Sequence, residues 1–249
     1  MLVREYMRAN PSTVLPKTTC SNAFRLMQEK DIYKLPVVAE EGELVGMVTQ
    51  KDLLYVLPSS AALLSVSEID SLFGKMTVER VMTRRVISVS EDCPLEEAAR
   101  ILVDNKIGSL PVVRDGRLVG MITKADILRV MMEALGGRME GLRVMVRLQE
   151  DTGELGAITD GIVQLGGTLI NLSTFWGGDP FHQTVTLKVQ GIDPLELMSL
   201  LENNIGVQVI DHRQSGAEYQ AEIVSPPVNK AVFPFQKLSS ELIRFTDSR

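Results

Sequence analysis

The first half of the chain is an internal duplication, and this constrains the fold more than any other feature. Three segments recur at an offset of 74 or 75 positions: VREYM at 3–7 with VERVM at 78–82, LPVV at 35–38 and 110–113, and GMVTQKD at 46–52 with GMITKAD at 120–126. A long period that occurs only twice predicts two copies of one module packed on each other, because solenoids usually need three or more units. Small ligands tend to bind in the space between such modules.

The element pattern divides the chain into two kinds of domain. Each copy of the duplication predicts the order strand, helix, strand, strand, helix, whereas the period changes after Gly136-Gly137 and predicts a ferredoxin-like two-layer βαββαβ domain. The expected fold class is therefore mixed α/β and α+β. The predicted organisation is a first repeat at 1–60, a linker at 61–76, a second repeat at 77–136, the βαββαβ domain at 138–214 and an extension of unassigned role at 215–249.

The composition favours a cytoplasmic protein that acts on neither membranes nor nucleic acids. The chain has 249 residues, of which 45% are hydrophobic, and no apolar run approaches the length of about 18 to 20 residues that crosses a bilayer. Its start lacks the apolar core of a signal peptide, and its two cysteines, Cys20 and Cys93, fit neither a disulfide framework nor a metal site. Residues 138–214 carry 10 acidic and 5 basic side chains, which disfavours binding of a phosphate backbone through this domain, while a local basic patch in the first half stays open as an alternative.

The repeated Gly-Met-x-Thr-x-x-Asp segment has two interpretations. In the ligand-binding one, glycine allows close approach of a ligand, the helix start offers N–H groups to a phosphate, and the aspartate accepts hydrogen bonds from the hydroxyls of a ribose. In the structural one, Thr-x-x-Asp before an apolar helix is a capping box. Two copies at matched positions, each with a preceding glycine, favour ligand binding.

The doubled pattern of VREYM, LPVV and GMVTQKD resembles a tandem pair of CBS (cystathionine-β-synthase) domains, also called a Bateman module, over residues 1–135. The resemblance implies a pseudo-twofold disc that binds adenosyl ligands, such as AMP, ADP, ATP or S-adenosylmethionine, in two clefts between the repeats. It places Asp52 and Asp126 at ribose and Thr49 and Thr123 near phosphate. The resemblance also places five residues against adenine: Met47, Met121, Ile32, Ile87 and Ile107. The position before Leu-Pro-Val points toward phosphate in that family, and here it is Lys34 in one copy and Ser109 in the other. The cleft with Asp52 and Lys34 is favoured if only one is occupied, and Lys34 as a solvated surface lysine is the alternative.

Residues 139–214 resemble an ACT domain. The stretch Asp151-Thr152-Gly153-Glu154-Leu155 stands where that family has Asp-x-Pro-Gly-x-Leu, with Thr152 in the place of proline, and Gly166–Asn171 follows. The resemblance implies homodimerisation and an amino-acid site at Gly153, Glu154 and Asn171. Because Glu154 would repel the carboxylate of an amino acid, dimerisation alone is favoured. The order of a CBS pair and an ACT-like domain resembles bacterial acetoin-utilisation regulatory proteins.

Catalysis finds little support in the sequence. Its two histidines lie in no motif, and it has no nucleophile elbow, phosphate-binding loop, zinc-protease motif or cysteine cluster. We therefore expect a non-enzymatic regulatory sensor that needs no cofactor or metal, binds an adenosyl ligand, forms a homodimer and signals to an unidentified protein partner. The alternative is a structural or interaction scaffold without a small-molecule ligand. An enzyme, the third hypothesis, requires turnover of the nucleotide.

Overall fold

A computed structural model describes residues 1–55, 74–149, 153–175 and 182–215. Most of the predicted linker 61–76 and nearly all of the extension 215–249 lie outside these ranges. Within them, no helix is both long and apolar enough to cross a membrane. The elements are α1 (Val3–Tyr6), β1 (Arg8–Ala9), α2 (Cys20–Glu29), β2 (Lys34–Val38), β3 (Leu44–Thr49), α3 (Gln50–Tyr55), η2 (Val78–Arg80), β4 (Val89–Ser90), α5 (Leu95–Asp104), β5 (Ser109–Arg114), β6 (Arg117–Thr123), α6 (Lys124–Ala134), β7 (Gly141–Gln149), α7 (Glu154–Gln164), β8 (Thr168–Phe175), β9 (His182–Gln190), α8 (Pro194–Ser199), η3 (Leu200–Ile205) and β10 (Gln208–Ser215).

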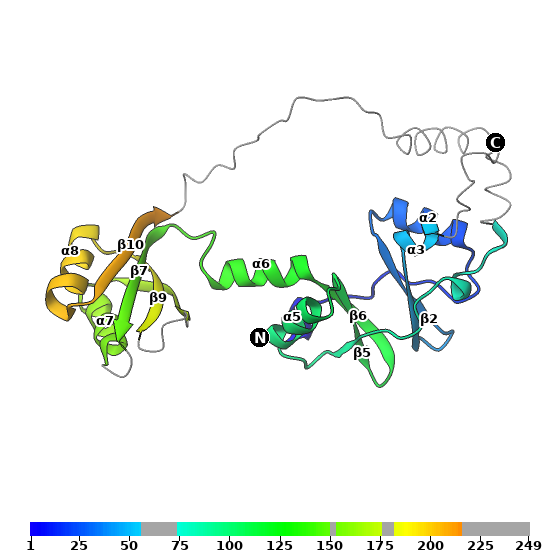
Figure 1. The fold of residues 1–249 in the computed structure, drawn as a ribbon, viewed down its shortest axis with the longest axis horizontal. Helices are drawn as coiled ribbons and strands as arrows, with labels where there is room; N and C mark the ends of the chain where they lie inside the picture. Colours follow the sequence, from blue (N-terminus) through cyan, green and yellow to red (C-terminus); the bar gives the residue numbers. More distant parts are fainter. Residues whose placement is uncertain (56–73, 150–152, 176–181, 216–249) are drawn as a thin grey trace, which may run out of the picture.

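Each repeat is built around an antiparallel hairpin with helices packed on it (Figure 1). In the first, β2 pairs with β3 and Leu35 lies opposite Val48; in the second, β5 pairs with β6 and Leu110 lies opposite Ile122. All four side chains are fully buried. Asp115 and Gly116 form the turn between β5 and β6, and both have the positive φ that a two-residue type I′ hairpin turn requires.

The two repeats exchange their opening segments. Strand β1 pairs with β6 of the second repeat, and Val3 of α1 lies in the second repeat's core with Leu95 and Leu110. Conversely, Val78 and Met82 lie in the first repeat's core with Leu35 and Leu53, and Thr83 pairs with Met47 of β3. Each packed unit therefore contains chain from both copies, which the duplication by itself does not predict.

The glycines of the repeated motif make room for these exchanged segments. A Cβ on Gly46 would lie 2.5 Å from the sulfur of Met82, and a Cβ on Gly120 would collide with the sulfur of Met7. A methionine side chain thus fills the space beside each glycine. The prediction that these glycines allow a ligand to approach is wrong, because the close approach is made by the other repeat.

The hairpin turns of the two repeats also touch. The backbone N–H of Leu44 donates to the carbonyl oxygen of Gly116 over 3.2 Å, and that of Leu118 donates to the carbonyl oxygen of Gly42 over 3.1 Å. We use "seam" for the contact between the repeats, made by these turns and the exchanged segments.

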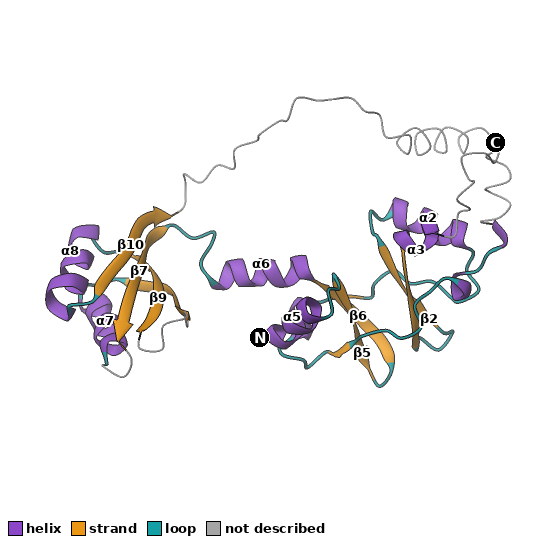
Figure 2. Ribbon diagram, viewed as in Figure 1, coloured by secondary structure: helices purple, strands orange, loops and turns teal. Residues whose placement is uncertain are grey.

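The described residues 141–149, 153–175 and 182–215 form the predicted βαββαβ order. Their four-stranded antiparallel sheet has the strand order β10-β7-β9-β8, and the helices α7 and α8 cover one face of it (Figure 2). Alternate residues of β7 and β9, among them Val144, Val146 and Leu187, meet Ile158 and Leu197 of these helices in a fully buried core. The element order is confirmed, whereas membership of the ACT family remains a prediction.

Helix α6 joins the second repeat to this sheet. At its C-terminal end, the carbonyl oxygen of Ala134 accepts a hydrogen bond from Nδ2 of Asn171 over 2.8 Å, and that of Gly136 accepts one from Nζ of Lys188 over 2.7 Å. Lys188 is only 5% exposed, and burial lowers the pKa of its ammonium group. The carbonyl of Ala134, the last helical residue, is thereby satisfied by a side chain of the other domain, and Lys188 binds the turn that follows the helix.

The contact between Gly46 and Met82 predicts that Gly46→Ala destabilises the protein. Because the added methyl group overpacks a buried site, we expect the free energy of unfolding to fall by about 1 to 3 kcal/mol in chemical denaturation. Gly156→Ala is the control, since a Cβ there meets nothing within 4 Å in the helix α7, and it should raise stability by about 0.5 to 1 kcal/mol. Equal stability of Gly46→Ala and the unaltered protein would contradict this packing.

Candidate functional site

The two Thr-x-x-Asp segments lie at matched turns from strand to helix, β3 to α3 and β6 to α6. In the first, Oδ2 of Asp52 accepts hydrogen bonds from the N–H and the hydroxyl of Thr49 over 2.8 and 2.7 Å, and the N–H of Asp52 donates to Oγ1 of Thr49 over 3.2 Å. Thr123 and Asp126 make the same three bonds over 3.0, 2.6 and 3.2 Å. Both segments are therefore capping boxes, as the structural interpretation predicts, and each leaves Oδ1 of its aspartate outside the cap. We call them the Asp52 site and the Asp126 site.

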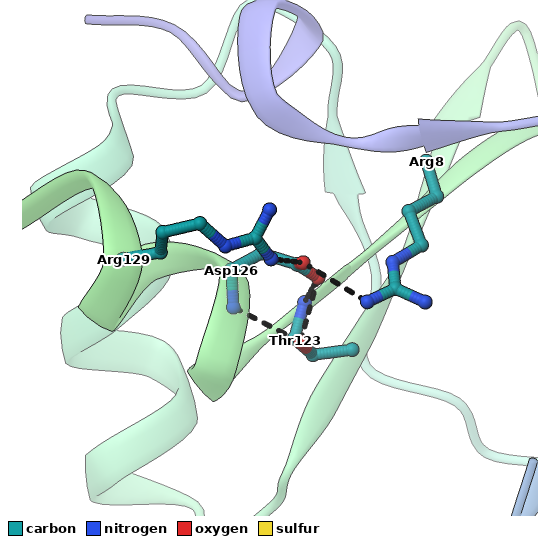
Figure 3. A network of polar contacts seen from close by, with 4 residues as sticks. All are labelled: Arg8, Thr123, Asp126 and Arg129. Atoms are coloured by element: carbon teal, nitrogen blue, oxygen red, sulfur yellow. Dashed lines mark hydrogen bonds and ion pairs between the residues drawn. The ribbon is translucent and has the colours of Figure 1, made fainter.

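At the Asp126 site, two arginines hold the remaining carboxylate oxygen. Nη2 of Arg129, one turn along α6, lies 2.6 Å from Oδ1 of Asp126, and Nη2 of Arg8, from the exchanged strand β1, lies 3.4 Å from the same atom. Figure 3 shows the two guanidinium groups reaching the carboxylate from different elements. Asp126 is 3% exposed. Burial raises the pKa of Asp126, but the hydrogen bonds from Thr123 and the two arginines outweigh it, so the pKa lies below its ordinary value.

The Asp52 site has the same backbone and different neighbours. Thr83 is the equivalent of Arg8, because it pairs with Met47 as Arg8 pairs with Met121. Tyr55 is the equivalent of Arg129, because each follows the aspartate of its site by three residues. Among the described residues, nothing donates a hydrogen bond to Oδ1 of Asp52. The ring of Tyr55 instead lies 5.3 Å from the ammonium group of Lys51. One carboxylate therefore has two guanidinium groups at its second oxygen, whereas no described residue donates to the second oxygen of the other.

The two arginines were not identified from the sequence. Arg129 follows Asp126 by three positions on one helix face, which is the spacing of a helical ion pair and was available as a signal. Arg8 is 118 positions from Asp126 and meets it only because the opening segments are exchanged. An alignment of the two copies does show a difference at this position, because the residue equivalent to Arg8 in the second copy is Thr83.

The two residues predicted to face phosphate lie beside these caps. Lys34 is the cross-strand partner of Thr49, and Ser109 is that of Thr123. Oγ of Ser109 is the one buried side-chain polar atom of the described residues that has no hydrogen-bond partner. The ammonium group of Lys34 reaches the second repeat, where it lies 3.6 Å from the position of a Cβ on Gly108. Lys34 is thus at the seam, between the two sites, rather than confined to the Asp52 site.

The residues predicted to pack on adenine are partly accessible, except for Met121, which is buried. Met47 is half-buried, Ile107 lies at the edge of the second repeat's core, and Ile87 is 39% exposed. Met121 is 9% exposed. The register places Met47 and Met121 beside the exchanged segment of the opposite repeat, so both repeats contribute to their surroundings.

The predicted amino-acid site of the second domain is not assembled as one group. Gly153 has φ +72° before α7, and Oε2 of Glu154 accepts a hydrogen bond from the N–H of Gln149 over 3.0 Å. On β9, Gln149 pairs with His182, and Asn171 pairs with Lys188 six residues further along the strand. At the usual rise of a strand, these two positions on β9 are about 20 Å apart. Asn171 instead binds the end of α6. The turn therefore retains Gly153 and Glu154, while Thr152 lies outside the described residues.

Two further features of the described residues bear on chemistry. No group of three or more histidine, cysteine, aspartate or glutamate side chains among them is placed to hold a metal ion. Both cysteines are free thiols, with Cys20 buried and Cys93 partly exposed. Burial raises the pKa of each thiol.

Comparison with known proteins gives matches to the first half of the chain. The CBS-domain model matches residues 3–59 and 78–133. A CBS domain-containing protein of Dictyostelium discoideum is 30% identical over 138 residues, which are 54% of this chain and 94% of that protein. The next curated relatives are named as enzymes, and the chain spans only 24% and 23% of their length.

Solved structures match over the same region. A crystal structure named as an acetoin utilization protein (AcuB) from Vibrio cholerae is 33% identical and covers 55% of this chain and 93% of its own, with a TM-score of 0.46. CBSX2 of Arabidopsis thaliana, solved in complex with AMP, is 33% identical and covers 53% of this chain and 96% of its own, with a TM-score of 0.45.

The arginine contacts of Asp126 predict a pH-dependent contribution to stability. Because the pKa of Asp126 is lowered in the folded protein, its stabilising effect is present above the unfolded value of about 3.9 and is lost as the pH falls through the folded value. We expect Asp126→Asn to lower the free energy of unfolding by about 1 to 3 kcal/mol at pH 7, and this difference to shrink below about pH 4. Denaturant titrations between pH 7 and 3 would measure it.

Asp52→Asn is the matched control for this prediction. It changes the same capping box without removing an arginine contact, so its effect at pH 7 should be smaller. Equal losses for the two variants, or a loss for Asp126→Asn that does not change with pH, would show that the arginines contribute nothing.

Proposed function

Because this chain belongs to the CBS-domain family, we propose that it is a regulatory sensor that binds an adenosyl ligand at the seam between its two CBS repeats. The observation that carries the proposal is the paired arrangement of Thr49 with Asp52 and Thr123 with Asp126 at equivalent helix starts. Each pair lies beside the exchanged segment of the opposite repeat. A ligand bound there contacts both repeats at once.

The side chains around each aspartate suit the parts of such a ligand. The ribose hydroxyls donate to the carboxylate, since an ionised aspartate only accepts hydrogen bonds. The half-buried Met47 and the accessible Ile87 offer apolar surface to adenine, as do Met121 and Ile107. The unpaired hydroxyl of Ser109 and the ammonium group of Lys34 offer a donor and a positive charge to phosphate.

Regulation follows from the position of the ligand between two units that can shift relative to each other. A ligand changes the balance between two arrangements only if it binds them unequally. A molecule that contacts α3 or α6 and the exchanged segment of the other repeat meets this condition, because any rotation at the seam alters its contacts. No chemical change of the ligand is part of this proposal.

A scaffold without a ligand is the second candidate, and one observation favours it. The hydroxyl of each threonine and one oxygen of each aspartate are already used in capping the helices α3 and α6. This explains why those residue types stand there, but it leaves Oδ1 of Asp52 and the hydroxyl of Ser109 without a role.

Calorimetric titration of the purified full-length protein, stripped of bound ligand, tests the proposal. We expect adenosine, AMP, ATP or S-adenosylmethionine to bind with a Kd on the order of micromolar. Asp52→Asn and Asp126→Asn should each remove binding at one site, since each loses the carboxylate that accepts from ribose. Asp193→Asn is the control, because Asp193 also caps a helix, α8, but in the other domain.

Two results would reject the sensor. One is the absence of binding for every ligand, with both site variants only less stable, which would favour the scaffold. The other is unchanged binding in the double variant Asp52→Asn with Asp126→Asn. Chromatography of the nucleotide after incubation would detect turnover and so test the proposal that the protein is not an enzyme.

For the second domain, we infer dimerisation with another copy of the chain. Its βαββαβ order and the positions of β10 and β8 at the two ends of the sheet, as far as the described residues show it, support side-by-side pairing. An amino acid as a further ligand is restricted to the turn at Gly153 and Glu154, where the carboxylate of Glu154 opposes an amino-acid carboxylate. Dimerisation is therefore the first role that we propose for this domain.

The dimer predicts a molecular mass in solution twice that of one chain. Sedimentation equilibrium of the full chain at micromolar concentrations would measure it, because an association of this kind depends on protein concentration. A mass of one chain throughout the concentration range would contradict the proposed dimer without affecting the nucleotide proposal.

A further inference from the structure

Resting on the proposed function, we propose that Arg8 makes the Asp126 site selective for adenosyl ligands that carry a negatively charged group. The Asp52 site, in contrast, accepts the same ribose with or without that charge. The two sites of one duplicated module thus recognise different classes of ligand.

Both oxygens of the Asp126 carboxylate are occupied before a ribose binds. Oδ2 is used by Thr123, and Oδ1 is used by Arg8 and Arg129. A ribose that is to donate to this carboxylate must displace one of these contacts. Arg8 is the one that gives way, because its distance to Oδ1 is 3.4 Å against 2.6 Å for Arg129 and its side chain is 67% exposed.

When Arg8 moves away from Asp126, its positive charge is left without a partner. Two guanidinium groups surround one carboxylate, so the site has one positive charge in excess. A phosphate group on the ligand can take Arg8 as a partner and form a charge-assisted, bidentate pair with it. A neutral nucleoside offers no such partner, so it has to compete with Arg8 for Asp126 without compensation.

The first repeat adds a further cationic group near this site, the ammonium group of Lys34. The ammonium group of Lys34 lies beside Gly108, whose carbonyl oxygen accepts a hydrogen bond from the N–H of Lys124, the first residue of α6. Gly108 directly precedes Ser109, whose hydroxyl has no partner. Positive charge therefore gathers at the start of α6 from both repeats.

The Asp52 site lacks the equivalent arginine contacts, and Lys34, the cross-strand partner of Thr49, directs its ammonium group to Gly108 of the second repeat. Thr83 and Tyr55 replace the two arginines, and no described residue donates to Oδ1 of Asp52. Two arginines do follow Thr83 in the chain, but Arg84 donates to the carbonyl oxygen of Glu79 over 3.1 Å, and Arg85 is not among the described residues that donate to Asp52. A ribose can therefore bind this carboxylate without displacing a cation.

The test isolates each site and compares adenosine with AMP by calorimetry. In Asp52→Asn, where only the Asp126 site keeps its carboxylate, AMP should bind about tenfold or more tightly than adenosine. Adding Arg8→Gln should remove this preference, because it weakens the binding of AMP and strengthens the binding of adenosine. Arg8→Lys should retain part of the preference. In Asp126→Asn, where only the Asp52 site remains, the two ligands should differ by about threefold or less.

Arg4→Gln is the control, because Arg4 lies on the neighbouring helix α1 and pairs with Asp92 rather than with Asp126. It should leave the preference of Asp52→Asn for AMP unchanged. Equal binding of adenosine and AMP in Asp52→Asn, or a preference that survives Arg8→Gln, would overturn the role of Arg8 while leaving the sensor intact. Absence of binding by the unaltered protein would instead reject the proposed function itself. The circular dichroism spectrum of the single variant Arg8→Gln, compared with that of the unaltered protein, shows whether the variant is folded and so separates loss of the fold from loss of selectivity.

Discussion

The packing of each repeat's opening segment against the other repeat is the interaction on which the first domain depends. Met82 occupies the space beside Gly46, and Met7 occupies that beside Gly120, so each hairpin is completed by chain from the opposite copy. Val3 and Val78, both fully buried, carry the exchange into the two cores. Neither repeat has a complete core alone, and the two therefore fold as one unit around the seam.

The exchange also explains how one duplicated sequence makes two chemically different sites. The backbone and the caps are the same in both copies, because they depend on hydrogen bonds between Thr49 and Asp52 and between Thr123 and Asp126. The difference comes from what the opposite repeat delivers, Thr83 in one case and Arg8 in the other. A duplicated module can thus diverge at its ligand sites by changes in a short strand that lies far away in the sequence.

Local interactions were predictable from the sequence, and distant ones were not. The capping boxes join residues three positions apart, and the Asp115-Gly116 turn depends on two adjacent residues, so both are visible in the order of residue types. The alternation of buried residues likewise predicted the βαββαβ order of the second domain. Arg8 and Asp126 are 118 positions apart, and the function of the motif glycines depends on methionines of the other copy, so neither follows from a local pattern. Asn171 shows the same limit, because its partner is the end of α6 and not the turn at Gly153.

Helix α6 has its two ends in different domains. It begins at the cap formed by Thr123 and Asp126, and after 11 residues Asn171 of the second sheet binds the carbonyl oxygen of its last residue, Ala134, while Lys188 binds that of Gly136 just beyond the helix. Because the ammonium group of Lys188 is buried and binds the carbonyl oxygen of Gly136, separating the helix from the sheet would leave a buried charge unpaired. These contacts tie the end of α6, a helix about 16 Å long, to the second sheet. A tilt imposed on its first turn would reappear as a displacement of the whole second sheet, so the direction of that tilt decides which way the two domains swing.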